Sequence, residues 1–118
     1  MILFIDTTDN AEIEVGLSDG GRILSSQKIP AERQQGEKLL PAIENVLRKK
    51  KIKLSELEAI EVKNRGGSFT SLRVGVAAAN ALGFALGIPV RGTVGTAKTV
   101  DGIDIVEPKY GREPDIGS

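Results

Sequence analysis

Two short segments of this 118-residue chain hold the side chains best suited to bind a charged ligand. Asp6, Thr7 and Thr8 follow the apolar run that opens the chain, and a carboxylate with hydroxyls at a strand end can coordinate a hard cation or hold a phosphate. Gly67 and Ser68 precede an apolar segment, where the free NH groups of a helix start can bind an anion. An ordinary turn is the alternative for both segments. The first lacks a glycine for close phosphate approach, and the second lacks the lysine of a Walker loop.

The composition removes most catalytic chemistry. The chain contains neither cysteine nor histidine, which excludes disulfides, zinc–cysteine sites, and nucleophiles activated by histidine. A ribonuclease-type two-metal site needs several converging carboxylates, but Asn64 and Arg65 follow the fourth expected strand. We therefore expect no catalytic residues, no metal site and no cofactor.

Charge and hydropathy point to a protein of the cytoplasm. Sixteen basic and sixteen acidic residues cancel, so the broad positive field of an independent RNA-binding protein is absent, and any contact with RNA would need a partner. The basic run from Lys49 to Lys53 indicates a solvated helix end, with contact to RNA as the alternative. No secretory signal opens the chain. The apolar run from Val74 to Val90 is shorter than the ~20 residues that span a bilayer.

The hydrophobic patterns predict an α/β protein of one domain. Three strands form an antiparallel meander, with a glycine turn at Asp19–Gly21, and a helix, a strand, a second helix and further strands follow. Because Pro41 has no NH to donate, the first helix either begins shortly before it or is kinked there, and we prefer the late start. The expected elements are strands at Met1–Asp6, Ile13–Leu17 and Arg22–Lys28, a helix with apolar positions from Leu39 to Leu47 and Glu37 near its start, a helical turn at Leu54–Leu57 capped by Ser55, a strand at Ala59–Val62, a helix after the Gly66–Thr70 turn, a strand that begins at Ile88–Val90 and a last strand at Ile103–Val106.

The order β-β-β-α-β-α-β predicts a mixed sheet with helices packed on it, most similar to a ribonuclease-H-like half. The second helix is unusually apolar, since Asn80 is its only polar side chain beyond Val74. Gly75, Ala79 and Gly83 share one helical stripe, which favours close contact with a neighbouring backbone. We interpret this stripe as part of a subunit interface, with packing inside the chain as the alternative.

Three segments together resemble the bacterial TsaB (YeaZ) family, a relative of TsaD within the ASKHA superfamily. They are ILFIDTT at Ile2–Thr8, GEKLLPAIENVL at Gly36–Leu47, and GGSFTSLRVGVAAANALGFALGIPV at Gly66–Val90. The third segment is the specific one, although Ser71 replaces a family glycine and the family proline is absent. Gln35 and Gly36 stand where the family often has histidine and serine, so a role that depends on that histidine does not carry over.

The resemblance implies a non-catalytic partner of TsaD in the threonylcarbamoyladenosine modification of ANN-decoding tRNAs. In that family the two helices dock against the equivalent helices of TsaD, and TsaE joins through the complex. We therefore expect a homodimer or a heterodimer through both helices and no association with a membrane. We expect tRNA to be contacted only indirectly, through a partner. The expected partner contacts are Leu39, Ile43, Leu47, Leu72, Arg73, Gly75, Ala79 and Gly83.

The end of the chain resembles the family's terminal motif through Pro108, Tyr110 and Arg112. This resemblance implies a compact form without the family's usual second domain, divided into a domain at 1–106 and an extended tail at 107–118. A different class of function stays open. The chain is alternatively a degenerate ASKHA-type domain that binds nucleotide or associates with itself in an unrelated role.

Overall fold

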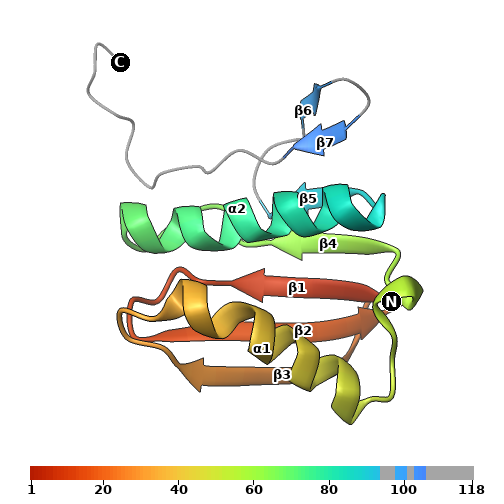
Figure 1. Cartoon of the computed structure of the whole chain (residues 1–118), viewed down its shortest axis with the longest axis horizontal. Coiled ribbons are helices and arrows are strands. Elements are labelled where there is room, and N and C mark those ends of the chain that lie inside the picture. Colours follow the sequence, from red (N-terminus) through yellow and green to blue (C-terminus); the bar gives the residue numbers. More distant parts are fainter. Residues whose placement is uncertain (94–97, 101–102, 106–118) are drawn as a thin grey trace.

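The computed structural model describes residues 1–93, 98–100 and 103–105, and it contains a five-stranded mixed sheet (Figure 1). The strands are β1 (Ile2–Asp6), β2 (Glu12–Asp19), β3 (Arg22–Pro30), β4 (Ala59–Val62) and β5 (Val90–Gly92), in the spatial order β3-β2-β1-β4-β5. The first three strands are antiparallel neighbours, whereas β4 runs parallel to both β1 and β5. The predicted meander and the mixed sheet are therefore confirmed.

Two helices and one helical turn connect these strands. They are α1 (Gln35–Lys49), α2 (Phe69–Leu86) and the 3₁₀ turn η1 (Leu54–Glu56). A separate hairpin follows β5 and consists of β6 (Lys98–Val100) and β7 (Ile103–Ile105). The sequence pattern indicated β7 but not β6. The predicted boundary at residue 106 and the tail motif of Pro108, Tyr110 and Arg112 lie outside the described residues.

The meander turn forms as its glycines predict. Gly20 and Gly21 have φ values of 59° and 82°, which are left-handed conformations that a two-residue hairpin turn of this type needs at both positions. A strand partner therefore follows β2 with only two connecting residues.

Both helices cover the same face of the sheet, and the core lies between them and the strands. Alternate residues of each strand point to this face, as the two-residue period of a strand requires. The buried aliphatic side chains include Leu3, Ile5, Ile13, Val15, Leu17, Leu39, Ile43, Val46, Leu47, Ile60, Val62, Leu72, Val76 and Val90. On the opposite face Ile2 and Phe4 are only half-buried.

Two local expectations are wrong. Helix α1 begins at Gln35, well before Pro41, and runs through the proline. Pro41 and Glu37 are both exposed, so water can bond the carbonyl group that loses its partner within the helix. The turn η1 has Lys53 rather than Ser55 at its N-cap position, and no side chain caps it.

The small-residue stripe of α2 faces the chain's own sheet, so its interpretation as a partner contact is wrong. A Cβ atom at Gly75 would lie 2.6 Å from the Thr7 hydroxyl oxygen, and one at Gly83 would lie 2.1 Å from a methyl carbon of Val90. Ala79 between them is 0% exposed. The stripe is small because strands β1 and β5 pass directly beneath it.

The larger side chains expected at the interface are also internal. The four leucine and isoleucine residues are at most 4% exposed because each helix turns its long aliphatic side chains toward the sheet; they are Leu39, Ile43, Leu47 and Leu72. Arg73 alone among the expected contacts is exposed. Its role at an interface stays a prediction.

Replacement of Gly83 by alanine should destabilise the isolated chain. The added methyl group collides with Val90, and overpacking of this kind costs about 1–3 kcal/mol, more than the gain of up to about 1 kcal/mol in helix propensity. The measurement is the free energy of unfolding in urea. Gly36→Ala is the matched control, because no atom lies within 4 Å of the added group at that helical glycine. Equal stability of the two variants would contradict the internal packing of the stripe.

Candidate functional site

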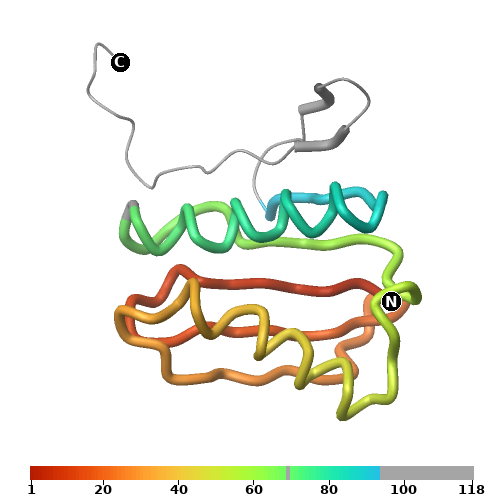
Figure 2. The backbone as a smooth tube through the Cα atoms, in the orientation of Figure 1, coloured from red at the N-terminus to blue at the C-terminus, as the bar shows by residue number. Residues whose placement is uncertain are grey.

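The carboxyl end of β1 and the loop that leads to β2 lie at the end of the sheet where both helices begin (Figure 2). This end holds every residue of the predicted cation, phosphate or anion sites. The loop is short, polar and irregular, so its backbone groups need partners outside the sheet. The first residue of α1 supplies some of those partners, and the first turns of α2 bond side chains of the same loop.

The Thr7 hydroxyl joins β1 to the first turns of α2. It donates a hydrogen bond to the Ser71 carbonyl oxygen at 2.5 Å and accepts one from the Gly75 backbone NH at 3.0 Å. These two backbone groups are four residues apart and would pair with each other in a regular helix. Thr7 is 0% exposed, so its hydroxyl is a structural bridge and not a ligand or a nucleophile.

The Gln35 side chain joins the same loop to α1. Its amide nitrogen lies 3.0 Å from the Thr7 carbonyl oxygen, 2.6 Å from that of Asp9 and 3.4 Å from that of Glu12. Gln35 is only 7% exposed although it is the first residue of the helix. An amide donor at this position therefore satisfies loop carbonyl groups that the sheet leaves unpaired.

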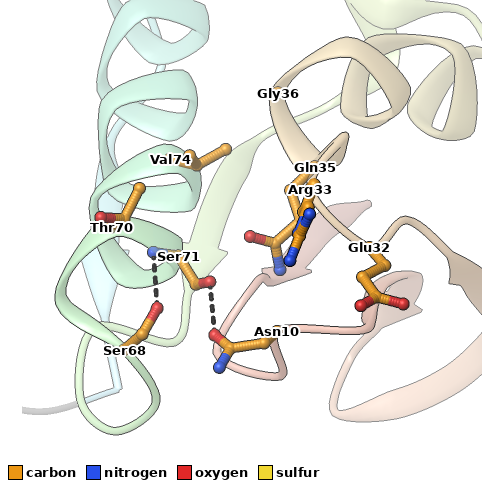
Figure 3. A pocket seen from close by; sticks show the side chains of 9 residues that line it. All are labelled: Asn10, Glu32, Arg33, Gln35, Gly36, Ser68, Thr70, Ser71 and Val74. Atoms are coloured by element: carbon orange, nitrogen blue, oxygen red, sulfur yellow. Dashed lines mark hydrogen bonds between the residues drawn. The ribbon is translucent and has the colours of Figure 1, made fainter.

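Two further hydrogen bonds fix the start of α2 (Figure 3). The Ser68 hydroxyl accepts from the Ser71 backbone NH at 3.0 Å, which is an N-cap interaction. The Ser71 hydroxyl donates to the Asn10 side-chain oxygen at 2.8 Å. Gly67 has a φ of 74° and passes so close to Thr8 that a Cβ atom would lie 2.0 Å from the Thr8 carbonyl oxygen. The glycine turn thus serves capping and close packing.

Asp6 points away from Thr7, because successive side chains of a strand leave it on opposite faces. Its carboxylate accepts hydrogen bonds from the Thr8 backbone NH at 2.8 Å and from the Thr8 hydroxyl at 2.6 Å. The Lys63 ammonium lies 3.9 Å from its other oxygen. Within the described residues no group of three or more acidic, histidine or cysteine side chains is arranged to hold a metal ion.

The five residues of the predicted ligand sites do not converge on one cavity. Ser68 borders an open cavity of about 450 Å³ between the starts of α1 and α2, together with Asn10, Glu32, Arg33, Gln35, Gly36, Thr70, Ser71 and Val74 (Figure 3). Asp6 and Thr8 border a different cavity of about 200 Å³. The arrangement supports a rigid loop rather than a shared cation or phosphate site.

Charge interactions at the opposite end of β1 are separate from this site. The Met1 amino group donates a hydrogen bond to the Glu58 carboxylate at 2.5 Å, and this contact lowers the pKa of Glu58. Glu58 precedes β4, whose first residue pairs with the first residue of β1. The ion pair therefore marks the far end of the sheet.

The outward face of α2 carries an apolar stripe that the sequence patterns did not single out. Val74 is half-buried, Ala77 and Ala81 are exposed, and Phe84 is 65% exposed. A shallow cavity of about 380 Å³ lies on this face, lined by Thr70, Arg73, Val74 and Ala77. The spacing of three and four residues from Thr70 to Phe84 is the signal that defines it.

The chain is matched by a family model and belongs to that family. The model is described as TsaD, tRNA N6-adenosine threonylcarbamoyltransferase, and it matches residues 22–100, which is more than half of the chain. The described part of the chain contains no helix long and apolar enough to cross a membrane.

Solved structures confirm the resemblance to TsaB (YeaZ) proteins. YeaZ from Pseudomonas aeruginosa is 30% identical, with a TM-score of 0.71 over 78% of this chain and 42% of that chain. A second structure from that organism, described as similar to peptidase YEAZ, gives the same values. This likeness also confirms the ribonuclease-H-like, ASKHA-type fold.

Two mycobacterial proteins share a shorter region. Uncharacterized protein ML0378 of Mycobacterium leprae is 46% identical over 56 residues, which are 48% of this chain and 16% of that protein. Uncharacterized protein Rv3421c of Mycobacterium tuberculosis is 42% identical over 60 residues, or 51% of this chain and 28% of that protein. The chain spans less than half the length of each of these relatives.

Replacement of Thr7 by valine should destabilise the fold by about 1–3 kcal/mol, because two buried backbone groups of α2 lose their shared partner. The shape of the side chain is nearly unchanged. Thr7→Ser is the control, since it keeps the hydroxyl and loses only one buried methyl group, worth about 0.8 kcal/mol. Urea unfolding measures both. A serine variant as unstable as the valine variant would show that packing, and not the bridge, matters at this position.

Proposed function

We propose that the chain is a non-catalytic, TsaB-like subunit that binds a TsaD-family protein and takes part in tRNA threonylcarbamoyladenosine modification. The outer face of α2 is its docking surface, with support from α1. The partner holds the metal, the nucleotide and the reactive site. TsaE joins through that partner.

The observation that carries this proposal is the apolar stripe on the outside of α2. Val74, Ala77, Ala81 and Phe84 follow each other along one side of the helix; Val74 is half-buried and the other three are exposed. Contiguous apolar surface of this kind marks interaction sites in soluble proteins. The alanines matter because small side chains let a partner helix approach closely, while Phe84 offers a large apolar group at the end of the stripe.

Helix α1 extends the same outer layer. Leu40 is 55% exposed, and it lies at the edge of the buried face of α1, three residues before Ile43. Helices presented side by side on a rigid sheet form a flat surface, which suits pairing with two helices of a related domain. Family membership favours a TsaD-family protein as that partner.

Several features support a role without catalysis. The Thr7 hydroxyl is buried in a structural bridge, and the Asp6 carboxylate is engaged by Thr8. The chain has no histidine or cysteine to activate a nucleophile. One relative is described by similarity to a peptidase, but the described hydroxyl groups of this chain that contact a carboxylate, Thr8 with Asp6 and Ser26 with Glu14, have no histidine to activate them.

Ala77→Arg should weaken the binding of a TsaD-family protein by at least about tenfold, because a buried charge at the centre of an apolar interface costs more than about 1.4 kcal/mol. Isothermal titration with the purified partner measures the affinity. The thermal unfolding of the variant should match that of the unaltered chain, since Ala77 is exposed and arginine is a good helix former.

Ile23→Arg is the matched control for this experiment. Ile23 is 74% exposed on β3, so it is an apolar residue on a different surface. Partner binding should be unchanged by this control. If both variants bind the partner normally, the docking surface is wrong. If the unaltered chain forms only a homodimer that Ala77→Arg dissolves, the self-associating alternative is correct.

The purified chain should show no ATPase, protease or nuclease activity, as expected for a subunit whose candidate catalytic groups are engaged in structural hydrogen bonds. Release of phosphate from ATP is the simplest measurement. Turnover at ordinary enzymic rates that Asp6→Ala abolishes would make Asp6 a catalytic residue and contradict the proposed role.

A further inference from the structure

The turn that follows α1 carries an unusual concentration of positive charge. Arg48, Lys49, Lys50, Lys51 and Lys53 lie within six residues, and all five side chains are exposed. Within the described residues none of them forms a salt bridge. We call residues 48–53 the basic turn.

The helix dipole explains only part of this cluster. Arg48 and Lys49 belong to the last turn of α1, where cations interact favourably with the partial negative charge of the helix end. Lys51 and Lys53 lie beyond the helix. Their charges add repulsion within the turn without capping α1.

Lys51 occupies a position at which glycine is the favoured residue. Its φ is 57°, in the left-handed region that side chains with a Cβ atom disfavour. The Lys51 NH bonds the Arg48 carbonyl at 3.0 Å, and the Ile52 NH bonds the Leu47 carbonyl at 2.9 Å. This pair of bonds is the Schellman motif, which usually has glycine at the left-handed position.

Helix α2 provides a comparison within the same chain. It ends in the same pair of hydrogen bonds, from Gly87 to Phe84 and from Ile88 to Gly83, and Gly87 has a φ of 68°. An isoleucine packed against the core follows in both motifs. The chain thus uses glycine at the end of α2 and keeps a lysine at the end of α1. A residue that breaks a local rule without structural gain is typical of a functional site.

Both signs of charge occur at each end of the sheet, since Glu58 contacts Met1 at one end and Lys63 contacts Asp6 at the other. The basic turn lies at the end of α1 that is nearest the N-terminus (Figure 1). Asp6, Asp9 and Glu12 lie at the opposite end of β1. The basic turn nevertheless places five exposed cations within six residues, so a zero net charge does not prevent it from attracting a polyanion at short range.

We propose that the basic turn contacts the phosphate backbone of an RNA. This contact is weak and adds to the binding of the RNA by the partner. The identity of the polyanion rests on the proposed function, since the matching family modifies tRNA. Four of the five cations are lysines, and the turn contains no aromatic side chain. Lysine binds phosphate as a point charge, whereas reading of bases needs stacking or bidentate groups. The contact is therefore independent of base sequence.

The test measures binding of an unmodified tRNA transcript to the isolated full chain at low and at moderate salt. The triple variant Arg48→Gln, Lys50→Gln, Lys53→Gln should bind the transcript at least about tenfold more weakly at ~50 mM salt. The slope of the logarithm of affinity against the logarithm of salt concentration should fall by about 2–3. Lys51→Gly should weaken binding by about threefold while it raises the unfolding temperature.

The matched control is Arg22→Gln, Lys28→Gln, Lys38→Gln, which removes one arginine and two lysines at exposed positions elsewhere. It should change RNA affinity less than twofold. The proposal is overturned if the unaltered chain does not bind the transcript, if both triple variants weaken binding equally, or if Lys51→Gly leaves binding unchanged. Binding to vesicles of anionic lipid in place of RNA would overturn it as well.

Partner binding separates this proposal from the proposed function. The basic-turn variant should bind a TsaD-family protein as tightly as the unaltered chain does, whereas Ala77→Arg should lose that protein and keep the transcript. A variant that loses only the binding of RNA therefore concerns the basic turn, and a variant that loses only the binding of the partner concerns the proposed function.

Discussion

The hydroxyl of Thr7 is the constraint on which the rest of the structure depends. It lies at the end of the central strand β1, and its two hydrogen bonds fix where the first turns of α2 cross the sheet. Gly75 must be a glycine because the oxygen of Thr7 takes the space of a Cβ atom. From this crossing point the helix continues over β5, where Gly83 again leaves room for Val90. The unusual glycine content of α2 follows from the closeness of helix and sheet.

Gln35 and Ser71 extend this constraint to α1 and to the loop after β1. The loop is held on one side by the amide of Gln35 and on the other by the bond between Ser71 and Asn10. Both helix starts are therefore attached to one segment of backbone. A surface formed by the outer faces of the two helices therefore keeps its shape, and few of its groups lose conformational freedom when a partner binds.

The sequence was sufficient for the order of elements as far as β5, since strands such as Ala59–Val62 and the glycine turn at Gly20 and Gly21 follow local patterns. It was not sufficient to predict which face of α2 packs against the sheet. Periodicity defines the stripe of Gly75, Ala79 and Gly83, but a helix that is apolar all round gives no sign of which side meets the sheet. The excess of apolar residues did indicate a face left uncovered by the chain, and Phe84 shows where it is.

The candidate site was harder to predict than the fold, for two physical reasons. Neighbours in a strand point to opposite faces, so Asp6 and Thr7 could not form one site, and this alternation was available in the sequence. The partners of Thr7 and Gln35 were not available, because they are backbone groups far along the chain. The left-handed Lys51 was hidden for a similar reason, since a run of lysines does not reveal where a helix ends.

The alternation along β1 also governs which changes in chain length the protein can accept. One residue inserted or deleted within Ile2–Asp6 would exchange the faces of Asp6 and Thr7, so that a carboxylate would enter the core and the helix would lose its bridge. The Gly20 and Gly21 turn is exposed and is joined to the rest of the fold only through its two strands, so an extra residue there leaves the faces unchanged. Natural variation in length among relatives should therefore collect at the meander turn and be absent from the first strand.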